Sequence, residues 1–278
     1  RKAGRMIPNP SMTVTVLTLA LLGSLPRPAR AQTDEPIDQG LRQLEASVGH
    51  HNLSQGYASW QEASVRGLYR QGNHLWGMEL MHADRFNERG TFVGLQDRVQ
   101  VAPRWDISLA YGVGDGAPWL PRDRVDGFVH HTWGEHLNWV TNVGLGYYKA
   151  PDEHRDRWGS IGLTAWLEPY VKGPWVAQGE VRWSQSDPGS VRTHQYFLAL
   201  TWGRHGQTQI TGRHGWGREG WQSLGDARSI VDFASRQDTL IVQHWMARDW
   251  GIKVVADHYR NDQYRRQGVN LAWFREWP

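Results

Sequence analysis

The last stretch of the chain, residues 265–277, most constrains the fold, because its side chains alternate strictly in character. Every second residue back from the end carries a large side chain, and most of these are apolar: Trp277, Arg275, Trp273, Leu271 and Val269. A period of two residues places these side chains on one face of an extended strand. The stretch therefore predicts one long β-strand.

The same period recurs along most of the chain, and helical periodicity is not sustained anywhere. We expect fourteen strands, each close to the length of roughly ten residues that a tilted membrane strand needs. Twelve strands remain an alternative if 44–51 or 206–216 is not a strand, since single-chain bacterial barrels have an even number. The predicted spans are 44–51, 58–70, 74–85, 91–101, 105–114, 123–133, 137–148, 156–167, 174–185, 192–203, 206–216, 237–247, 250–260 and 264–277.

The apolar faces of these segments end in aromatic residues. In 196–202, for example, Tyr196 and Trp202 flank Leu198 and Leu200. Aromatic residues gather at both interfaces of membrane barrels. A soluble β-sandwich would also alternate, but its strands are usually only about five or six residues long. We therefore predict an all-β protein, a transmembrane antiparallel up-and-down β-barrel.

The spacing of Gly268, Leu271 and Trp273 near the end, with Trp277 after them, resembles the signal that marks bacterial outer-membrane barrels for insertion. The resemblance implies the barrel-assembly machinery and outer-membrane lipid as partners, in a Gram-negative bacterium. Pro278 follows the last aromatic residue and cannot donate a hydrogen bond, which weakens the match.

The N-terminal segment has the three parts of a secretory signal peptide. Arg1, Lys2 and Arg5 precede an apolar run from Val14 to Leu25, and 29–31 read Ala-Arg-Ala. A membrane-spanning helix needs roughly 20 apolar residues, more than this run offers. We expect residues 1–31 to be cleaved before Gln32, residues 32–43 to form a short periplasmic tail, and residues 44–278 to form the barrel domain.

Charge and cysteine content exclude several classes of protein. Removing residues 1–31 lowers Lys plus Arg from 31 to 26 against 28 Asp plus Glu, so the formal net charge falls from +3 to −2. This balance argues against nucleic-acid binding. The chain has no Cys, which excludes disulfides and Cys-based zinc sites.

The predicted connections fall into two alternating classes, short turns on the periplasmic side and longer loops outside. The longest is 217–236, which we expect either to fold into or over the pore or simply to extend the flanking strands. Trp119 and Trp221 are predicted to be exposed in outer loops, where they stack on sugar rings or complete the aromatic girdle.

Charged residues on the polar faces of the strands are the main candidates for function. A lipid-facing Arg or Lys costs about 2–4 kcal/mol at the membrane midplane, so we expect these side chains to face the lumen. Either they fill a narrow barrel as compensating ion pairs, or they line a water-filled conduit. The candidates are Glu62, Arg66, Glu79, Glu180, Arg182, Lys253 and Asp257.

Metal and catalytic sites are not expected. Adjacent residues on a strand point to opposite faces, so His130 and His131 cannot share one metal. Ser64 and the pair Thr193-His194 supply side chains for a hydrolase, but no nucleophile, base and orienting group can be assembled from spacing. We predict a protein that is not an enzyme and holds no cofactor.

Several runs resemble the YaiO-like outer-membrane β-barrel family: 44–47 (LEAS), 53–60 (LSQGYASW), 85–89 (RFNER) and the pattern from Trp245 to Gly251. The resemblance covers most of 44–277 and implies a link to exopolysaccharide export, with no catalytic residues to carry over. Unlike in some relatives, no tetratricopeptide segment is expected within residues 1–43.

We therefore expect a porin-like or export channel in the outer membrane, connected to exopolysaccharide or envelope glycan and to the proteins of an export system. The alternative is a closed structural or adhesin-type barrel that binds a partner through its outer loops.

Overall fold

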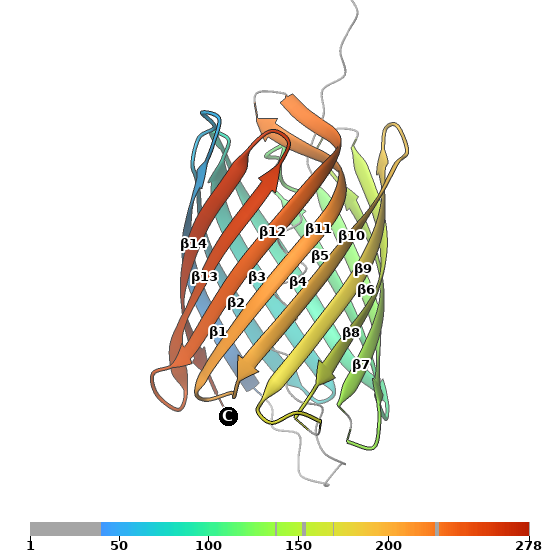
Figure 1. The fold of residues 1–278 in the computed structure, drawn as a ribbon, viewed down its shortest axis with the longest axis vertical. Helices are drawn as coiled ribbons and strands as arrows, with labels where there is room; N and C mark the ends of the chain where they lie inside the picture. The colour runs from blue at the N-terminus through green and yellow to red at the C-terminus, as the bar shows by residue number, and fades with distance from the viewer. Residues whose placement is uncertain (1–39, 137, 152–153, 169, 226–227, 278) are drawn as a thin grey trace, which may run out of the picture.

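The structure, a computed structural model, describes residues 40–277 except 137, 152–153, 169 and 226–227. It is a closed antiparallel β-barrel in which each strand pairs with its neighbours in sequence (Figure 1). The prediction of fourteen strands is confirmed. The strands are β1 (Gly40–Leu53), β2 (Trp60–Gln71), β3 (His74–Arg85), β4 (Glu88–Ala102), β5 (Trp105–Gly114), β6 (Asp123–Trp133), β7 (Trp139–Lys149), β8 (Arg155–Trp166), β9 (Trp175–Asp187), β10 (Val191–Gly203), β11 (Thr208–Gly225), β12 (Arg228–Trp245), β13 (Trp250–Asn261) and β14 (Arg265–Glu276).

The barrel closes where the first strand meets the last. β1 pairs with β14 from Gln43 opposite Glu276 to Leu53 opposite Arg266. Closure leaves no strand edge with unpaired backbone groups, which is what a strand assembly needs in lipid.

The first strand begins earlier than predicted. Residues 40–43 were expected in the periplasmic tail but belong to β1, where Gly40 lies opposite Arg70 and Gln43 opposite Leu68. A β-bulge between Leu41 and Gln43 shifts the register, and such a bulge hides the alternation from sequence inspection. The predicted signal peptide, 1–31, and the rest of the tail lie outside the described residues.

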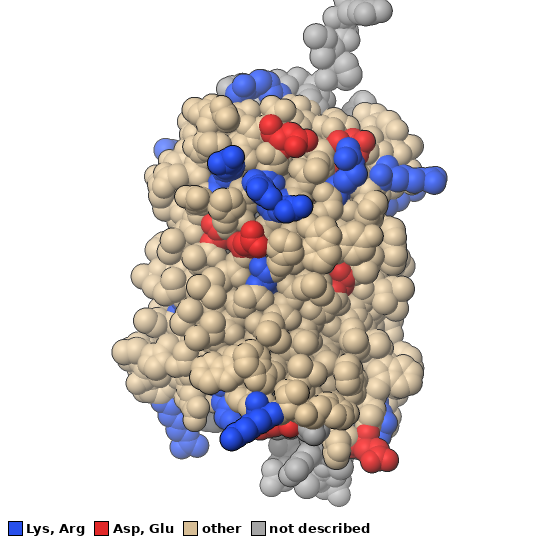
Figure 2. All heavy atoms as spheres, viewed as in Figure 1, with Lys and Arg blue, Asp and Glu red and all other residues tan. Residues whose placement is uncertain are grey.

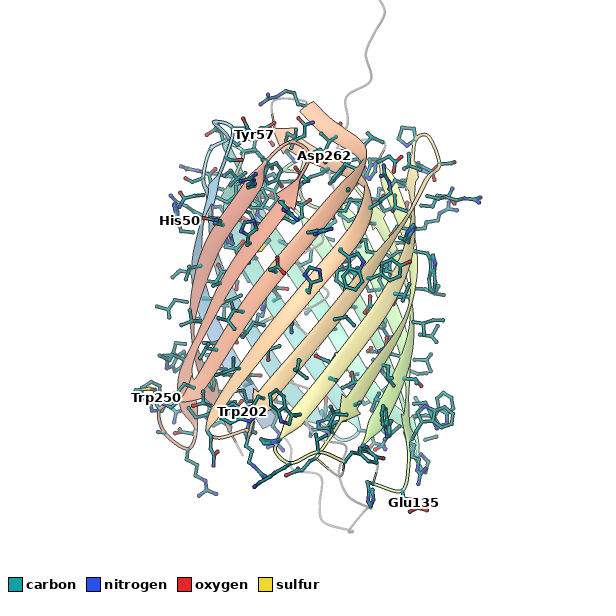
Figure 3. The ribbon with its side chains drawn as sticks, in the orientation of Figure 1. His50, Tyr57, Glu135, Trp202, Trp250 and Asp262 are labelled. Carbon is teal, nitrogen blue, oxygen red and sulfur yellow. The ribbon has the colours of Figure 1, made fainter. Side chains whose placement is uncertain are left out.

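The outer face of the barrel carries an apolar belt. Leu145 is 70% exposed and Val48 60%, as expected for side chains that contact lipid rather than a protein core. In Figure 2, charged side chains gather toward the two ends and a wide band between them is almost free of charge. Aromatic residues border this band, with Trp202 and Trp250 at the lower end in Figure 3. No helix among the described residues is long and apolar enough to cross a membrane.

The two ends of the barrel differ less in loop length than predicted. The chain ends at the lower rim in Figure 1, where turns such as 72–73 and 103–104 are tight. However, 167–174 at the same end is long, and 86–87 at the upper end has only two residues. The predicted loop 217–236 is mostly strand, because the ladder between β11 and β12 continues up to the pair Gly225 and Arg228.

Candidate functional site

The upper half of the lumen holds a buried network of ion pairs drawn from five strands. Arg266 on β14 donates to Asp257 on β13, with Nη2 2.8 Å from Oδ2. His51 on β1 contacts the same carboxylate, its Nδ1 lying 3.0 Å from Oδ1, and faces Glu62 on β2 at 3.7 Å. Arg85 on β3 donates to Glu62 at 2.8 Å. The network joins the start and the end of the chain across the barrel seam.

Trp60 lies at the centre of this network and is only 2% exposed. The guanidinium carbons of Arg85 and Arg266 lie 5.0 and 4.7 Å from its ring centroid, within the range of cation–π attraction. Gly268 makes room for His51, because a Cβ there would lie 1.8 Å from the ring Nδ1. This glycine, predicted as part of the insertion signal, therefore also serves packing in the folded barrel.

A second group of charges lines the same wall of the lumen lower down. Arg66 on β2 donates to Glu79 on β3 with Nη2 2.7 Å from Oε1, and lies 3.8 Å from Glu45 on β1. Lys253 on β13 forms an ion pair with Glu45 from the other side. The four residues alternate in sign, so each charge faces an opposite charge.

The opposite wall carries the pair of Glu180 and Arg182 on β9, 2.7 Å apart. Arg182 packs over Trp158 and Phe197, at 4.6 and 5.5 Å from the ring centroids. Arg213 on β11 also lines the lumen, and no ion pair to it is found within the described residues. Removing this charge would leave no carboxylate of the described residues without a partner.

The structure places six of the seven predicted lumen residues in the wall of a cavity of about 420 Å³. These are Glu62, Arg66, Glu79, Glu180, Lys253 and Asp257, while Arg182, which pairs with Glu180, is not in this wall and is 6% exposed. Sequence analysis did not select His51, Trp60, Arg85 or Arg266. The alternation itself could have placed His51 in the lumen, since it lies six residues after Glu45 on the same strand.

A lid covers the upper mouth of this cavity. The tips of β11 and β12 bend over the barrel end in Figure 1, and Trp221 on β11 stacks on His154 at 4.3 Å. On the other side, Tyr259 donates to Glu219 at 2.9 Å, and Gln222 donates to Tyr264. The hairpin therefore spans the mouth and is held at both sides.

Aromatic and apolar side chains fill the space beneath the lid. Tyr57, at the upper end in Figure 3, contacts Phe86 and Tyr264 edge to face, both at 5.7 Å between ring centroids. Trp119 and Leu120 of the connection between β5 and β6 are 1% and 0% exposed. Burial raises the pKa of Tyr264 above its ordinary value, so its hydroxyl stays protonated at neutral pH.

The lid corrects the expectation for Trp119 and Trp221. Both were predicted to be exposed, yet they are 1% and 3% exposed. Trp119 packs beside Arg85, whose guanidinium lies 4.8 Å from the ring, and Trp221 packs on His154. This burial could not be predicted from the sequence, because whether a tryptophan in a connection is exposed depends on whether another connection covers it.

The residues of the terminal-strand signal divide between the two faces of β14. Leu271 and Trp273 point outward and are 52% and 40% exposed, while Gly268 faces the lumen. The backbone N–H of Trp277 donates to the carbonyl of Arg42 at 3.0 Å, which ties the chain end to β1. Recognition of this strand by the assembly machinery stays a prediction.

The side chains considered for catalysis do not meet. Ser64 lies 2.7 Å from Ser47, oxygen to oxygen, in the lumen. Thr193 is buried on the inner side of β10, and its neighbour His194 is exposed on the outer side. Within the described residues, no group of three His, Asp or Glu side chains is arranged to hold a metal ion.

A closed barrel of antiparallel strands, an apolar outer belt bordered by aromatic residues and a polar lumen define an outer-membrane β-barrel with a porin-like fold. The chain belongs to the YaiO membrane β-barrel domain family, whose model matches residues 41–222.

Solved structures support the fold at low sequence identity. The chain is similar to a bacterial polysaccharide outer membrane secretin, with 10% identity, a TM-score of 0.55, and 86% of this chain and 99% of that chain covered. It is also similar to the outer membrane protein Omp33 of Acinetobacter baumannii, with 11% identity, a TM-score of 0.51, and coverage of 84% and 98%. The CymD monoaromatic hydrocarbon channel gives 6% identity, a TM-score of 0.51, and coverage of 87% and 89%. No curated protein matched the chain.

Proposed function

We propose that this protein is a gated outer-membrane channel for a neutral, hydroxyl-rich solute, such as a segment of an exopolysaccharide or envelope glycan. The observation that carries the proposal is the lumen wall, where charges of opposite sign pair across neighbouring strands around a cavity of about 420 Å³. Paired charges leave a small net field, so the wall repels neither cations nor anions strongly. It still offers many hydrogen-bond donors and acceptors.

Two further points support a glycan as the solute. Hydroxyl groups can exchange hydrogen bonds with carboxylates and guanidinium groups without the cost of burying a charge. The fold is similar to that of a bacterial polysaccharide outer membrane secretin, and the resemblance to the YaiO-like family implies a link to exopolysaccharide export.

A closed structural or adhesin-type barrel is the second candidate function. The lid favours it, because Trp221 and Leu224 are nearly fully buried and the mouth is covered in this structure. Under this alternative the ion pairs only fill the interior, and binding takes place on the outer surface of the lid and the neighbouring connections.

Conductance through planar bilayers separates the two. The native barrel is compared with a variant in which residues 219–233 are replaced by a two-residue Asn-Gly turn, joining the paired residues Arg218 and Ala234. A gated channel gives brief or rare openings in the native protein and stable conductance in the shortened one. Silence from both, with folding verified by circular dichroism, overturns the channel and leaves the structural barrel.

The lumen itself is tested with Arg213→Gln in the shortened background. The variant should lose part of any preference for anions, because Arg213 is a lumen cation with no ion-pair partner in the described part of the chain. A linear glucose oligomer should block the open pore when added to either side. An unchanged ion preference together with no block would refute the proposed conduction path.

A further inference from the structure

Three arginines stand side by side on the outer wall, just below the upper rim. Arg236 on β12 lies directly opposite Arg260 on β13, and Arg260 directly opposite Arg265 on β14. All three are exposed and share the face of Leu240 and Val269, which belong to the apolar belt. Figure 2 shows basic side chains over the upper third of this face, with acidic side chains among them. The row therefore lies on the lipid-facing side, at the height of the lipid headgroups.

Like charges directly opposite on neighbouring strands destabilise a sheet unless an anion lies between them. No carboxylate within ion-pair distance of these three arginines is found in the part of the chain that the structure describes. Arginines at the lower rim differ, since Arg204 lies 2.7 Å from Glu168 and Arg275 lies 3.2 Å from Asp249. Within the described part of the chain none of these three arginines has an ion-pair partner, and the carboxylate of Asp238, two residues from Arg236, pairs with His214 instead.

The layer one step below the arginines holds polar side chains and one carboxylate, that of Asp238 on β12, which lies opposite His258 and pairs with His214 at 2.6 Å. His258 on β13 lies opposite Gln267 on β14, with Nδ1 and Nε2 3.5 Å apart. On β1, Asn52 lies opposite Gln267, and His50, opposite Val269 one step further down, projects from the outer wall in Figure 3 at 3.2 Å from Asn52. These side chains can donate to ester, amide or hydroxyl oxygens at the junction of a headgroup and its acyl chains.

The next layer down is a shallow hollow with an apolar floor. Gly212 on β11 lies opposite Leu240 on β12, which lies opposite Ala256 on β13. A Cβ at Gly212 would meet no atom within 4 Å, so the hollow is open to the outside. The two small residues beside a leucine leave space that suits an acyl chain.

We propose that the outer face of β11 to β14 binds a phosphorylated glycolipid of the outer leaflet, with its phosphate on Arg236, Arg260 and Arg265 and an acyl chain in the hollow at Gly212. Guanidinium groups bind phosphate bidentately. A row of three suits a phosphorylated headgroup, which can contact several of them at once, better than it suits a single mobile counter-ion. The proposal places the end of the barrel opposite the chain terminus outside the cell. It is independent of whether the lumen conducts.

The test measures binding of purified diphosphoryl lipid A to the detergent-solubilised barrel by native mass spectrometry. Arg260→Gln/Arg265→Gln should weaken binding about tenfold or more. The matched control is Arg157→Gln/Arg192→Gln, which removes two exposed charges near the same rim. Those two arginines are separated by Gln185 and do not face each other, so binding should change less than about twofold.

A second variant tests the acyl position without changing charge. Gly212→Leu fills the open hollow, is tolerated by the fold because the added atoms meet lipid, and should weaken lipid A binding several-fold. It should leave the weak binding of inorganic phosphate unchanged.

Four results would overturn the proposal. One is equal binding of lipid A stripped of its phosphates. Another is equal affinity for phosphatidylglycerol, which would mean attraction to any anionic lipid. The third is an equal loss in the two double-arginine variants, which would mean that only net charge matters. Binding of inorganic phosphate as tight as that of lipid A would equally exclude a lipid as the occupant.

Discussion

The buried contact between Arg266 and Asp257 should be the most costly ion pair to break. Asp257→Asn keeps the size of the side chain but removes the charge that two guanidinium nitrogens approach at 2.8 and 3.2 Å. Arg266 is 4% exposed and lies against the Trp60 ring, so it has little access to water. Removing one partner of such a pair costs about 3–5 kcal/mol, and the retained amide oxygen offsets part of that cost. We expect a loss of about 3 kcal/mol in the free energy of unfolding.

Urea titration in lipid vesicles, followed by tryptophan fluorescence, measures this loss. Glu168→Gln is the control, because its partner Arg204 is 58% exposed and such surface pairs are worth less than about 1 kcal/mol. The double variant Asp257→Asn/Arg266→Gln should be more stable than Asp257→Asn alone, since it no longer buries an unpaired cation. A loss no greater than that of the control would refute the assignment of Arg266 to a buried ion pair with Asp257.

Three other perturbations follow from single contacts. Gly268→Ala should lower the yield of folded barrel, seen as loss of the heat-dependent shift on a gel, because the new Cβ overlaps the ring of His51; normal folding would contradict that packing. Leu271→Arg should cost about 2–4 kcal/mol in urea titration if this side chain faces the lipid midplane, and no cost would mean that it does not. The hydrogen bond to Glu276 raises the pKa of His205 above its ordinary value. The stabilisation by His205 is therefore full below the unfolded-state pKa and is lost as pH rises through the folded-state pKa, so His205→Ala should be more harmful at about pH 5.5 than at about pH 8.5; a loss that is constant or grows with pH would refute it.

The alternation of side chains was enough to predict the class of fold. A lipid environment requires every backbone group to be paired within the protein, so long alternating strands with aromatic ends leave a closed barrel as the solution. The same parity placed Glu62, Arg66 and Glu79 on the inner face, because a strand turns successive side chains to opposite sides. Both inferences depend only on the order of residues within one strand, so the sequence is sufficient for them.

Contacts between distant strands could not be predicted in this way. Lys253 pairs with Glu45 only because β14 closes against β1, and nothing in either segment encodes the partner. Register sets which side chains meet, and a single bulge such as the one between Leu41 and Gln43 changes it without altering composition.

The sequence by itself determined that this chain forms a membrane barrel with a polar interior, because a two-residue period and the cost of charge in lipid act residue by residue. Only the tertiary structure decided that the upper mouth is covered and that Trp119 and Trp221 are buried. The reason is physical: burial of a loop side chain depends on where another connection comes to rest. The tertiary structure also placed Arg236, Arg260 and Arg265 in one row, because that row depends on the register of three strands.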